Sequence, residues 1–241
     1  MRPEFSIIIP VFNEKDSLDC LYREIKHSLI THEGKYEIVF INDGSQDGSQ
    51  DVLDRLAALD ALVSVFSSSF NQGQHKALEK GFLKARGKII ITLDADLQND
   101  PCDIPLLLNK INEGFDLVCG WRDLRIDSWH KILKSKIGNF IQRKITKIKL
   151  HDMSCSLRAY KRNIVQGLFL NEKHEVGFIP YLLSQRTNKI IEVKINHRKR
   201  SFGKAKYPFF STSFGVSIYY IRLIILNLTK RRVTNKPAKK D

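Results

Sequence analysis

The sequence predicts an α/β fold in which a doubly wound, mainly parallel sheet is flanked by helices. Short apolar runs rich in isoleucine and valine alternate with amphipathic stretches of helical periodicity. Most of these runs contain an unbroken apolar stretch, which is typical of parallel strands that are covered on both faces. With 241 residues, 42% of them hydrophobic and 27% charged, the chain can bury a full core, which excludes a disordered protein or a disulfide-rich miniprotein.

Strand and helix signals alternate strictly over the first 93 residues. The predicted strands share an apolar, β-branched composition and cover 5–11 (FSIIIPV), 36–41 (YEIVFI), 63–66 and 88–93 (KIIITL). The predicted helices cover the stretch in which Leu18, Leu21, Ile25 and Leu29 recur at helical spacing, then 52–59 and 74–85. This order indicates repeated β-α units and therefore parallel pairing of the strands.

The alternation becomes less regular in the second half of the chain. The elements predicted there are a strand at 116–119 (DLVC), a long basic helix at about 128–148, a strand near 155–160, a helix around 180–185 and a strand at 189–195. The basic and polar composition of 230–241 predicts a flexible tail.

Basic residues gather in the second half. The chain carries a formal net charge of +14, yet residues 1–121 hold 12 basic and 19 acidic side chains, whereas residues 189–241 hold 14 and 2. Such asymmetry predicts an anionic partner for the second half, which could be nucleic acid, a membrane surface or a phosphorylated substrate. Nucleic acid is the least favoured, because the basic stretches contain no recognisable nucleic-acid-binding motif and the first half is acidic.

The cysteines and the amino terminus bear on the compartment. The four cysteines lie far apart and form no CxxC pair, which argues against a zinc site and against a disulfide framework. We therefore expect reduced thiols, mostly in the core. The first six residues lead straight into a strand-like run and do not resemble a signal peptide, so the sequence predicts a chain that starts in the cytosol.

Polar side chains follow four of the predicted strands. They lie at 10–14 (PVFNE), 42–45 (NDGS), 71–75 (NQGQH) and 94–98 (DADLQ). Because ligands of open α/β sheets bind beyond the carboxyl ends of the strands, we expect these four segments to meet at one edge and to form the site.

The Asp-x-Asp motif within the last of these segments predicts a metal. Asp94 and Asp96 point the same way if the chain stays extended between them, and two neighbouring carboxylates repel unless a cation lies close. Mg²⁺ prefers one or two carboxylates together with phosphate oxygens and water, so the motif predicts a divalent ion bound jointly with a diphosphate. The alternative is a solvated turn. It is less favoured, because an apolar strand precedes Asp94 and three other strands also end in polar segments.

Seven segments together carry a resemblance to a known family. They are IIIPVFNE (7–14), INDGSQDGS (41–49), FNQGQHKAL (70–78), LDADLQNDP (93–101), CGWRDLR (119–125), HDMSCSLRAY (151–160) and HRKRSFGKAKY (197–207). With these segments in this order and spacing, the sequence resembles family 2 glycosyltransferases of the GT-A fold, and among them the polyprenyl-phosphate (dolichol-phosphate-like) sugar synthases. The resemblance covers about residues 5–207.

The resemblance implies a domain organisation. A Rossmann-like GT-A catalytic domain with a mixed, mainly parallel sheet would cover 1–206, a membrane-interfacial helix 207–229 and a basic flexible tail 230–241. The uncharged run at 207–221 has 15 residues, which is short for a membrane-spanning helix. Its aromatic residues and the basic residues after 229 favour a shallowly inserted helix beside an anionic leaflet, with a buried core helix as the alternative.

The resemblance also implies roles by position. Donor binding is implied for Pro10, Phe12, Glu14, Asp43, Asp94, Arg198, Arg200 and Lys206. Acceptor-phosphate binding is implied for Arg122, Lys131 and Ser135, and metal binding for Asp94, Asp96 and Gln98, with Asp96 as the direct ligand. Catalysis would rest on Asp94, Asp96, Arg122 and Arg200.

Some of these acidic and basic residues have a structural alternative. Glu14 and Asp43 could instead cap a helix or form a turn. Asp152 and Arg158 lie in a segment that the resemblance places on the acceptor side, and a structural ion pair between them is equally plausible.

The implied activity is the transfer of a sugar, with inversion, from a UDP- or GDP-sugar to undecaprenyl or dolichyl phosphate. Mg²⁺ or Mn²⁺ would be the cofactor, and the product would serve cell-envelope glycan or lipid modification. A lipid phosphate is already an anion at neutral pH, so it needs no general base, whereas basic side chains are needed to hold both phosphates. We expect the enzyme at the cytoplasmic face of the plasma or inner membrane, either as a peripheral protein or with an integral-membrane partner.

The alternative is a family 2 transferase that acts on a glycan hydroxyl in surface polysaccharide synthesis. A hydroxyl has to lose a proton to attack, so this enzyme requires a carboxylate base near the acceptor, and Asp123 and Asp152 are the candidates.

Overall fold

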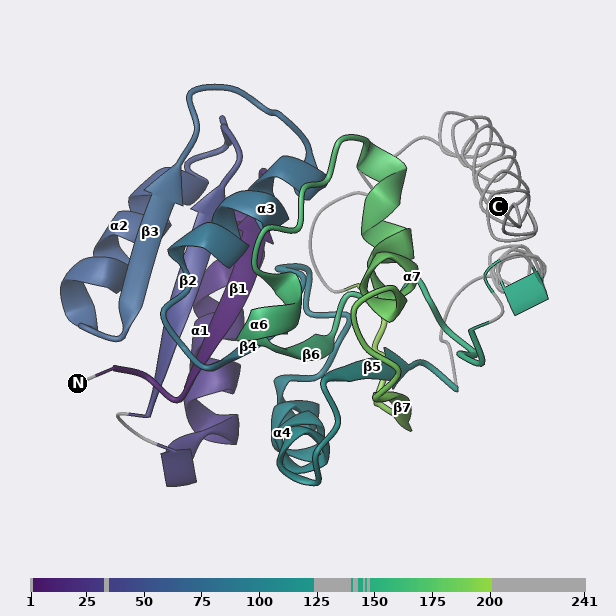
Figure 1. Ribbon diagram of the computed structural model, residues 1–241. Coiled ribbons are helices and arrows are strands. Elements are labelled where there is room, and N and C mark those ends of the chain that lie inside the picture. The colour runs from purple at the N-terminus through teal and green to yellow at the C-terminus, as the bar shows by residue number, and fades with distance from the viewer. Residues whose placement is uncertain are drawn as a thin grey trace, which may run out of the picture.

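The computed structural model describes residues 2–32, 35–123, 140, 143–144, 146 and 148–200 (Figure 1). The predicted interfacial helix at 207–229 and the tail at 230–241 lie outside these residues, as do the site candidates Lys131, Ser135 and Lys206. The catalytic domain predicted over 1–206 is therefore described in large part.

The centre of the fold is a seven-stranded sheet in the order β3-β2-β1-β4-β6-β5-β7. Its strands are β1 (Phe5–Val11), β2 (Tyr36–Asn42), β3 (Val63–Ser67), β4 (Ile89–Thr92), β5 (Leu117–Trp121), β6 (Arg158–Lys161) and β7 (Ile190–Lys194). Every pair is parallel except those of β6, which is antiparallel to both of its neighbours. The predicted mixed, mainly parallel sheet is confirmed.

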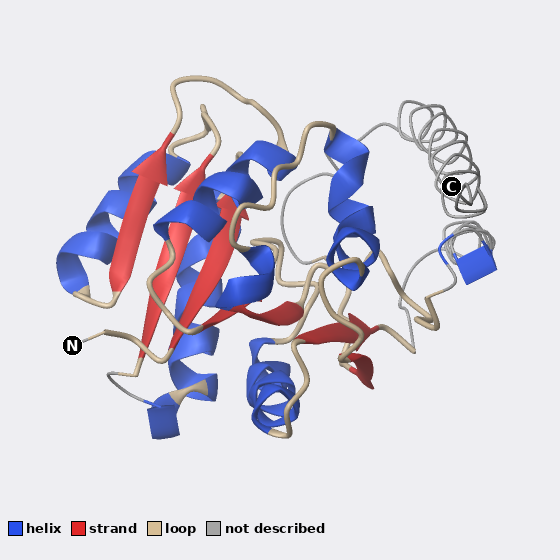
Figure 2. Cartoon of the chain, in the orientation of Figure 1, coloured by secondary structure: helices blue, strands red, loops and turns tan. Residues whose placement is uncertain are grey.

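Helices cover both faces of the sheet (Figure 2). One face carries α1 (Lys15–Ser28), α2 (Ser49–Leu59) and α4 (Ile104–Asn112), and the other carries α3 (Gln74–Lys84), α6 (Arg162–Val165) and α7 (Ile179–Ser184). Side chains along β1 point alternately to the two faces of the sheet, so Ile7 and Ile9 belong to one buried cluster and Ile8 to the other. None of the helices in the described part of the chain is long and apolar enough to cross a membrane.

Within the described residues, the connections also include the short 3₁₀ helices η1 (Ile30–His32), η2 (Pro101–Asp103) and η3 (Lys173–Phe178). All four cysteines are free thiols, and the expectation that most of them lie in the core holds for two. Cys119 and Cys155 are buried, but Cys102 is exposed.

Three helices and strands differ from those predicted. α4 and the short α6 are additions, although the buried residues Ile104, Leu107, Leu108 and Ile111 of α4 recur at helical spacing. β6 begins at 158 rather than near 155, and the carbonyl of Ser156 before it accepts a hydrogen bond from Thr92 Oγ1 (2.6 Å) instead of joining the strand ladder. Most of the helix predicted at 128–148 lies outside the described residues. Within that range, the described residues 140, 143, 144 and 146 are helical.

The strand order positions the site. The chain runs from β1 outward through β2 to β3, and then returns to add β4 on the other side of β1. At such a switch point the loops that follow the two neighbouring strands diverge, which opens a crevice at the carboxyl ends of β1 and β4.

Candidate active site

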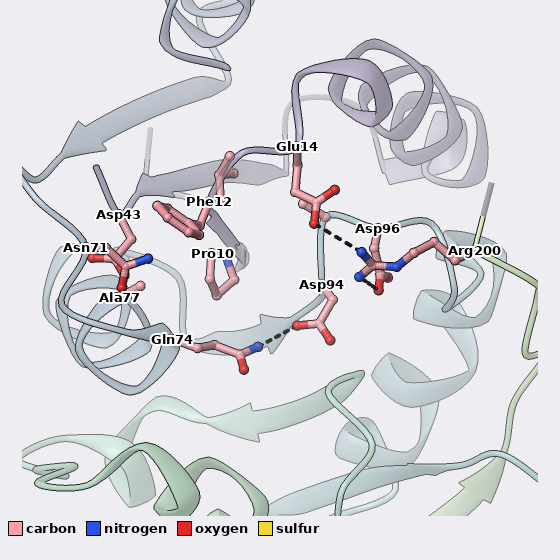
Figure 3. A pocket seen from close by; sticks show the side chains of 12 residues that line it. Pro10, Phe12, Glu14, Asp43, Asn71, Gln74, Ala77, Asp94, Asp96 and Arg200 are labelled. Carbon is pink, nitrogen blue, oxygen red and sulfur yellow. Dashed lines mark hydrogen bonds and ion pairs between the residues drawn. The ribbon is translucent and has the colours of Figure 1, made fainter. Parts of the chain in front are cut away.

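A cavity of about 260 Å³ opens at the carboxyl ends of β1 to β4 (Figure 3). Its lining residues come from all four polar strand ends, from α3 and from the segment after β7. They are Pro10, Val11, Phe12, Glu14, Asp43, Asn71, Gln74, Ala77, Asp94, Ala95, Asp96 and Arg200. The expectation that these strand ends meet at one edge is therefore met.

The turn after β1 brings Phe12 and Glu14 to the cavity. Asn13 adopts a left-handed conformation (φ 53°), which asparagine tolerates better than most residues. Its side-chain oxygen accepts from the backbone N–H of Gln46 (2.7 Å), so this turn is tied to the one after β2. Glu14 occupies the position before α1, but its side chain makes no capping hydrogen bond and faces the cavity.

Asp43 lines the cavity and also organises the loop beside it. Its two carboxylate oxygens accept from the backbone N–H groups of Gln72 (2.9 Å) and Gly73 (2.7 Å). Next to it, Gly44 has φ +73°, and a Cβ there would lie 2.5 Å from the carbonyl carbon of Phe70, so only glycine fits. The turn-forming alternative for Asp43 is thus present, and a contact with the donor stays a prediction.

The Asp-x-Asp segment lies at the opposite wall of the cavity. Gln74 Nε2 donates to Asp94 Oδ1 (2.8 Å), and Arg200 Nη2 pairs with Asp96 Oδ2 (2.6 Å). Leu97 is left-handed (φ 60°), so the chain turns sharply after the two acids, a strained conformation of the kind found at functional sites. Burial, followed by the charge of Asp96, raises the pKa of Asp94 to about 6.

The two acids are the groups that could hold a divalent ion. Within the described residues, no three or more His, Cys, Asp or Glu side chains are arranged as a complete metal site. Two carboxylates with a diphosphate and water would nevertheless suffice for Mg²⁺. The guanidinium of Arg200, which also lies 3.8 Å from Glu14 Oε1, shows that the acids already attract a cation. Gln98 does not line the cavity, and its backbone N–H donates to Asp96 Oδ1 (3.1 Å).

A second charged group lies where β5 ends. Arg122 binds Asp152 in a bidentate manner, through Nε (2.6 Å) and Nη2 (2.9 Å), and Nη2 also reaches Ser154 Oγ (2.9 Å). Only 13% of the Arg122 side chain and 4% of the Asp152 side chain are exposed. Although burial opposes it, the hydrogen bonds with Asp152 raise the pKa of Arg122 above its usual range. The partner of Asp152 is therefore Arg122.

Arg158 has a different role from the proposed ion pair with Asp152. It is 1% exposed and donates to the carbonyls of Met153 (2.7 Å) and Val176 (3.1 Å). It thereby fixes the backbone of the loop that carries Asp152. The other candidate base, Asp123, pairs with Lys194 (2.7 Å). Both candidate bases are thus engaged by cations.

Family comparison agrees with the arrangement of these strand ends. The model of the family "Glycosyl transferase family 2" matches residues 6–169, which is more than half of the chain. The chain belongs to this family. It is 38% identical over 204 residues to the undecaprenyl-phosphate 4-deoxy-4-formamido-L-arabinose transferase of Aeromonas hydrophila subsp. hydrophila, an alignment that covers 84% of this chain and 62% of that protein.

A second relative of this family 2 chain is the transferase of the same name from Proteus mirabilis. The identity is 39% over 206 residues, which covers 85% of this chain and 63% of the relative. The chain thus spans a little under two thirds of the length of these curated relatives.

Solved structures show the fold of this family 2 chain. Glucosyl-3-phosphoglycerate synthase from Mycobacterium tuberculosis in complex with UDP superposes with a TM-score of 0.65 at 18% identity, covering 92% of this chain and 79% of that one. The same enzyme with Mn²⁺, UDP and glucosyl-3-phosphoglycerate superposes equally well, with a TM-score of 0.65 at 18% identity, covering 92% and 79% of the two chains. The predicted GT-A fold is confirmed.

Arg198 does not lie with the other described residues that the family 2 resemblance assigns to the donor. Its guanidinium pairs with Glu24 (2.7 Å) and Asp100 (2.5 Å), and it does not line the cavity. Its backbone N–H donates to the carbonyl of Gln98 (2.8 Å), and His197 forms a β-bridge with Asn99. The structure therefore gives Arg198 an anchoring position beside the Asp-x-Asp turn.

Two polar cavity residues of this family 2 chain had no predicted role. Asn71 and Gln74 both line the cavity, and Gln74 holds Asp94. Both lie in the polar segment at 71–75, so their place at the site edge was predictable. The specific contact of Gln74 with Asp94 was not, because the two residues meet only when α3 and β4 are packed.

Proposed function

We propose that this chain transfers a sugar, with inversion, from a nucleotide-sugar donor to a polyprenyl phosphate. The names of two curated relatives, which act on undecaprenyl phosphate, support this acceptor class. Family membership supports glycosyl transfer, and the similar GT-A structure that holds Mn²⁺ and UDP supports a nucleotide-bound donor with a divalent ion.

The observation that carries the proposal is the distribution of charge around Asp94. Acids and Arg200 line the cavity, and Arg122, which does not line it, lies close enough for its charge to act on Asp94. Burial raises the pKa of Asp94, and the charge of Arg122 opposes that rise. A reaction that joins two anionic partners needs cations beside both of them, because the partners would otherwise repel each other.

The donor side fits a nucleoside diphosphate with a divalent ion. Pro10 and Phe12 form an apolar wall for the nucleoside, with Asp43 at its rim. Asp96, together with Asp94, would hold Mg²⁺ or Mn²⁺, and the predicted participation of Gln98 would require its side chain to turn toward them. When bound, the ion would stabilise the negative charge of the diphosphate leaving group.

The proposed acceptor, a lipid phosphate held by Arg122, would react without a general base. Arg122 would hold the lipid phosphate, one of whose oxygens attacks the anomeric carbon. The bond from that carbon to the diphosphate oxygen breaks, and its electron pair leaves with the diphosphate, so the configuration inverts. No proton has to be removed, which agrees with the ion pairs that occupy Asp123 and Asp152. Arg200 would then neutralise the diphosphate.

The proposed location follows from the acceptor. A polyprenyl chain resides in a bilayer, so we place the reaction at the membrane surface, on the cytoplasmic face where nucleotide sugars are made available. The interfacial helix at 207–229 and an integral-membrane partner belong to this proposal.

The test is a product assay with two acceptor types. The purified full chain is incubated with UDP- or GDP-sugars and Mn²⁺, and with either polyprenyl phosphate in vesicles or an oligosaccharide. We expect a sugar linked to the polyprenyl phosphate, which mild acid should release. Product formed only with the oligosaccharide would refute the proposal and support the hydroxyl-acceptor alternative.

A further inference from the structure

Two consecutive residues at the end of β5 pair with two consecutive residues of the loop before β6. The ring of Trp121 stacks on that of His151, with centroids 4.3 Å apart and an angle of 14° between the planes. The next residue on each side, Arg122 and Asp152, forms the bidentate ion pair. The stack and the ion pair therefore join the same two segments side by side.

Strand β7 secures the stacked rings from outside. The backbone N–H of His151 donates to Glu192 Oε2 (2.6 Å), and His151 Nδ1 contacts the other oxygen of the same carboxylate. Lys194 Nζ lies 4.9 Å from the centre of the Trp121 ring. Glu192 and Lys194 face β5 in register with Cys119 and Trp121, so the parallel pairing of β5 and β7 sets this geometry.

These contacts do little for the core. Half of the His151 side chain is exposed (51%), and neither ring belongs to the two buried apolar clusters. They act instead on the loop that carries Asp152, which is held on one side by the ring of His151, through Trp121 and Glu192, and on the other by Arg158, through the carbonyl of Met153. A loop held at both ends presents the Asp152 carboxylate in a single place.

The placing of Asp152 sets the direction of Arg122. Nε and Nη2 of Arg122 are occupied by Asp152 and Ser154, whereas Nη1 donates to no group in the part of the chain that the structure describes. With two of its nitrogens held, the planar guanidinium cannot rotate, so Nη1 is presented to a ligand in one orientation.

We propose that the Trp121–His151 stack, clamped by Glu192, is a positioning device that orients Arg122 toward the acceptor phosphate. This proposal rests on the proposed function, and neither Trp121 nor His151 lines the cavity. A misplacement of about 1 Å in an oriented group can cost up to about 100-fold in rate. A contact that positions Arg122 from outside the cavity can therefore affect the rate of the reaction.

The kinetic test uses the full chain with a nucleotide sugar and polyprenyl phosphate. We expect His151→Ala to raise the KM for polyprenyl phosphate about 10-fold while the KM for the donor changes less than about twofold. His151→Phe, which keeps an aromatic ring, should restore part of the loss. His32→Ala is the matched control, because His32 also contacts an aromatic ring, Phe5 (5.9 Å), but lies before β2, away from the site.

Two outcomes would overturn the proposal. One is an unchanged acceptor KM with a lower melting temperature, which would make the stack a stabilising contact only. The other is a crystal structure of His151→Ala in which the bidentate pair of Arg122 and Asp152 is intact, where we expect it to open or shift. This second measurement requires no activity, so it separates a failure of the positioning device from a failure of the proposed acceptor.

Discussion

Replacing Asp152 by asparagine separates an ion-pair role from a catalytic-base role. The substitution keeps the shape of the side chain and one acceptor oxygen, but removes the charge opposite Arg122. Removing one partner of a buried ion pair costs about 3–5 kcal/mol, because the other charge is left buried. With the two side chains 4% and 13% exposed, and one hydrogen bond retained, we expect a loss of stability near the lower end, about 3 kcal/mol.

Thermal unfolding measures this loss. A destabilisation of about 3 kcal/mol in a domain of this size lowers the Tm by about 6–12 °C. We also expect the KM for polyprenyl phosphate to rise, because Arg122 loses its orientation. Asp123→Asn is the matched control: its pair with Lys194 is 37% and 65% exposed, so its loss should cost less than about 1 kcal/mol.

A catalytic base would behave differently. If Asp152 removed a proton from a hydroxyl acceptor, Asp152→Asn would lower kcat by about 10²–10⁴-fold and leave the Tm nearly unchanged. That combination, with product formed on an oligosaccharide, would refute both the ion-pair reasoning and the base-free mechanism.

Further predictions concern the cavity and the thiols. Asp96→Ala should abolish transfer with near-normal circular dichroism, and wild-type turnover in saturating Mg²⁺ would contradict the metal assignment. Arg200→Ala should lower kcat more than it reduces sedimentation with vesicles; the opposite ranking would make Arg200 a membrane contact. Burial raises the pKa of Cys119 to about 12 and of Cys155 to about 11, so both stay protonated at pH 8. In native protein treated with an alkylating reagent at pH 8, mass spectrometry should therefore find alkylation at exposed Cys102 and none at Cys119 or Cys155. Labelling of either buried thiol would contradict this and indicate an open core.

The scaffold was predictable because its signals are local. The apolar runs that became β1 and β2 and the leucine spacing of α1 lie within single short windows of sequence, and the strand-end rule then brought Glu14 and Asp94 to one cavity. α4 carried an equally local signal in its apolar spacing.

The partners of charged side chains were not predictable in the same way. Arg198 belongs to a basic cluster that suits a diphosphate, yet it meets Glu24, which lies 174 residues away in the sequence. Asp152 meets Arg122 rather than Arg158, since β6 directs Arg158 into the core. Such choices depend on how separate elements are packed, and composition or spacing does not encode them.

The anchoring of Arg198 limits how far Arg200 can travel. The backbone of residues 197 and 198 bonds to that of residues 98 and 99, and the Arg198 guanidinium pairs with both Glu24 and Asp100. Only two peptide units separate that fixed point from Arg200, a tether of about 7 Å when fully stretched. We therefore expect that Arg200 releases Asp96 and reaches an arriving ligand by a short local rearrangement, without a long displacement of the chain.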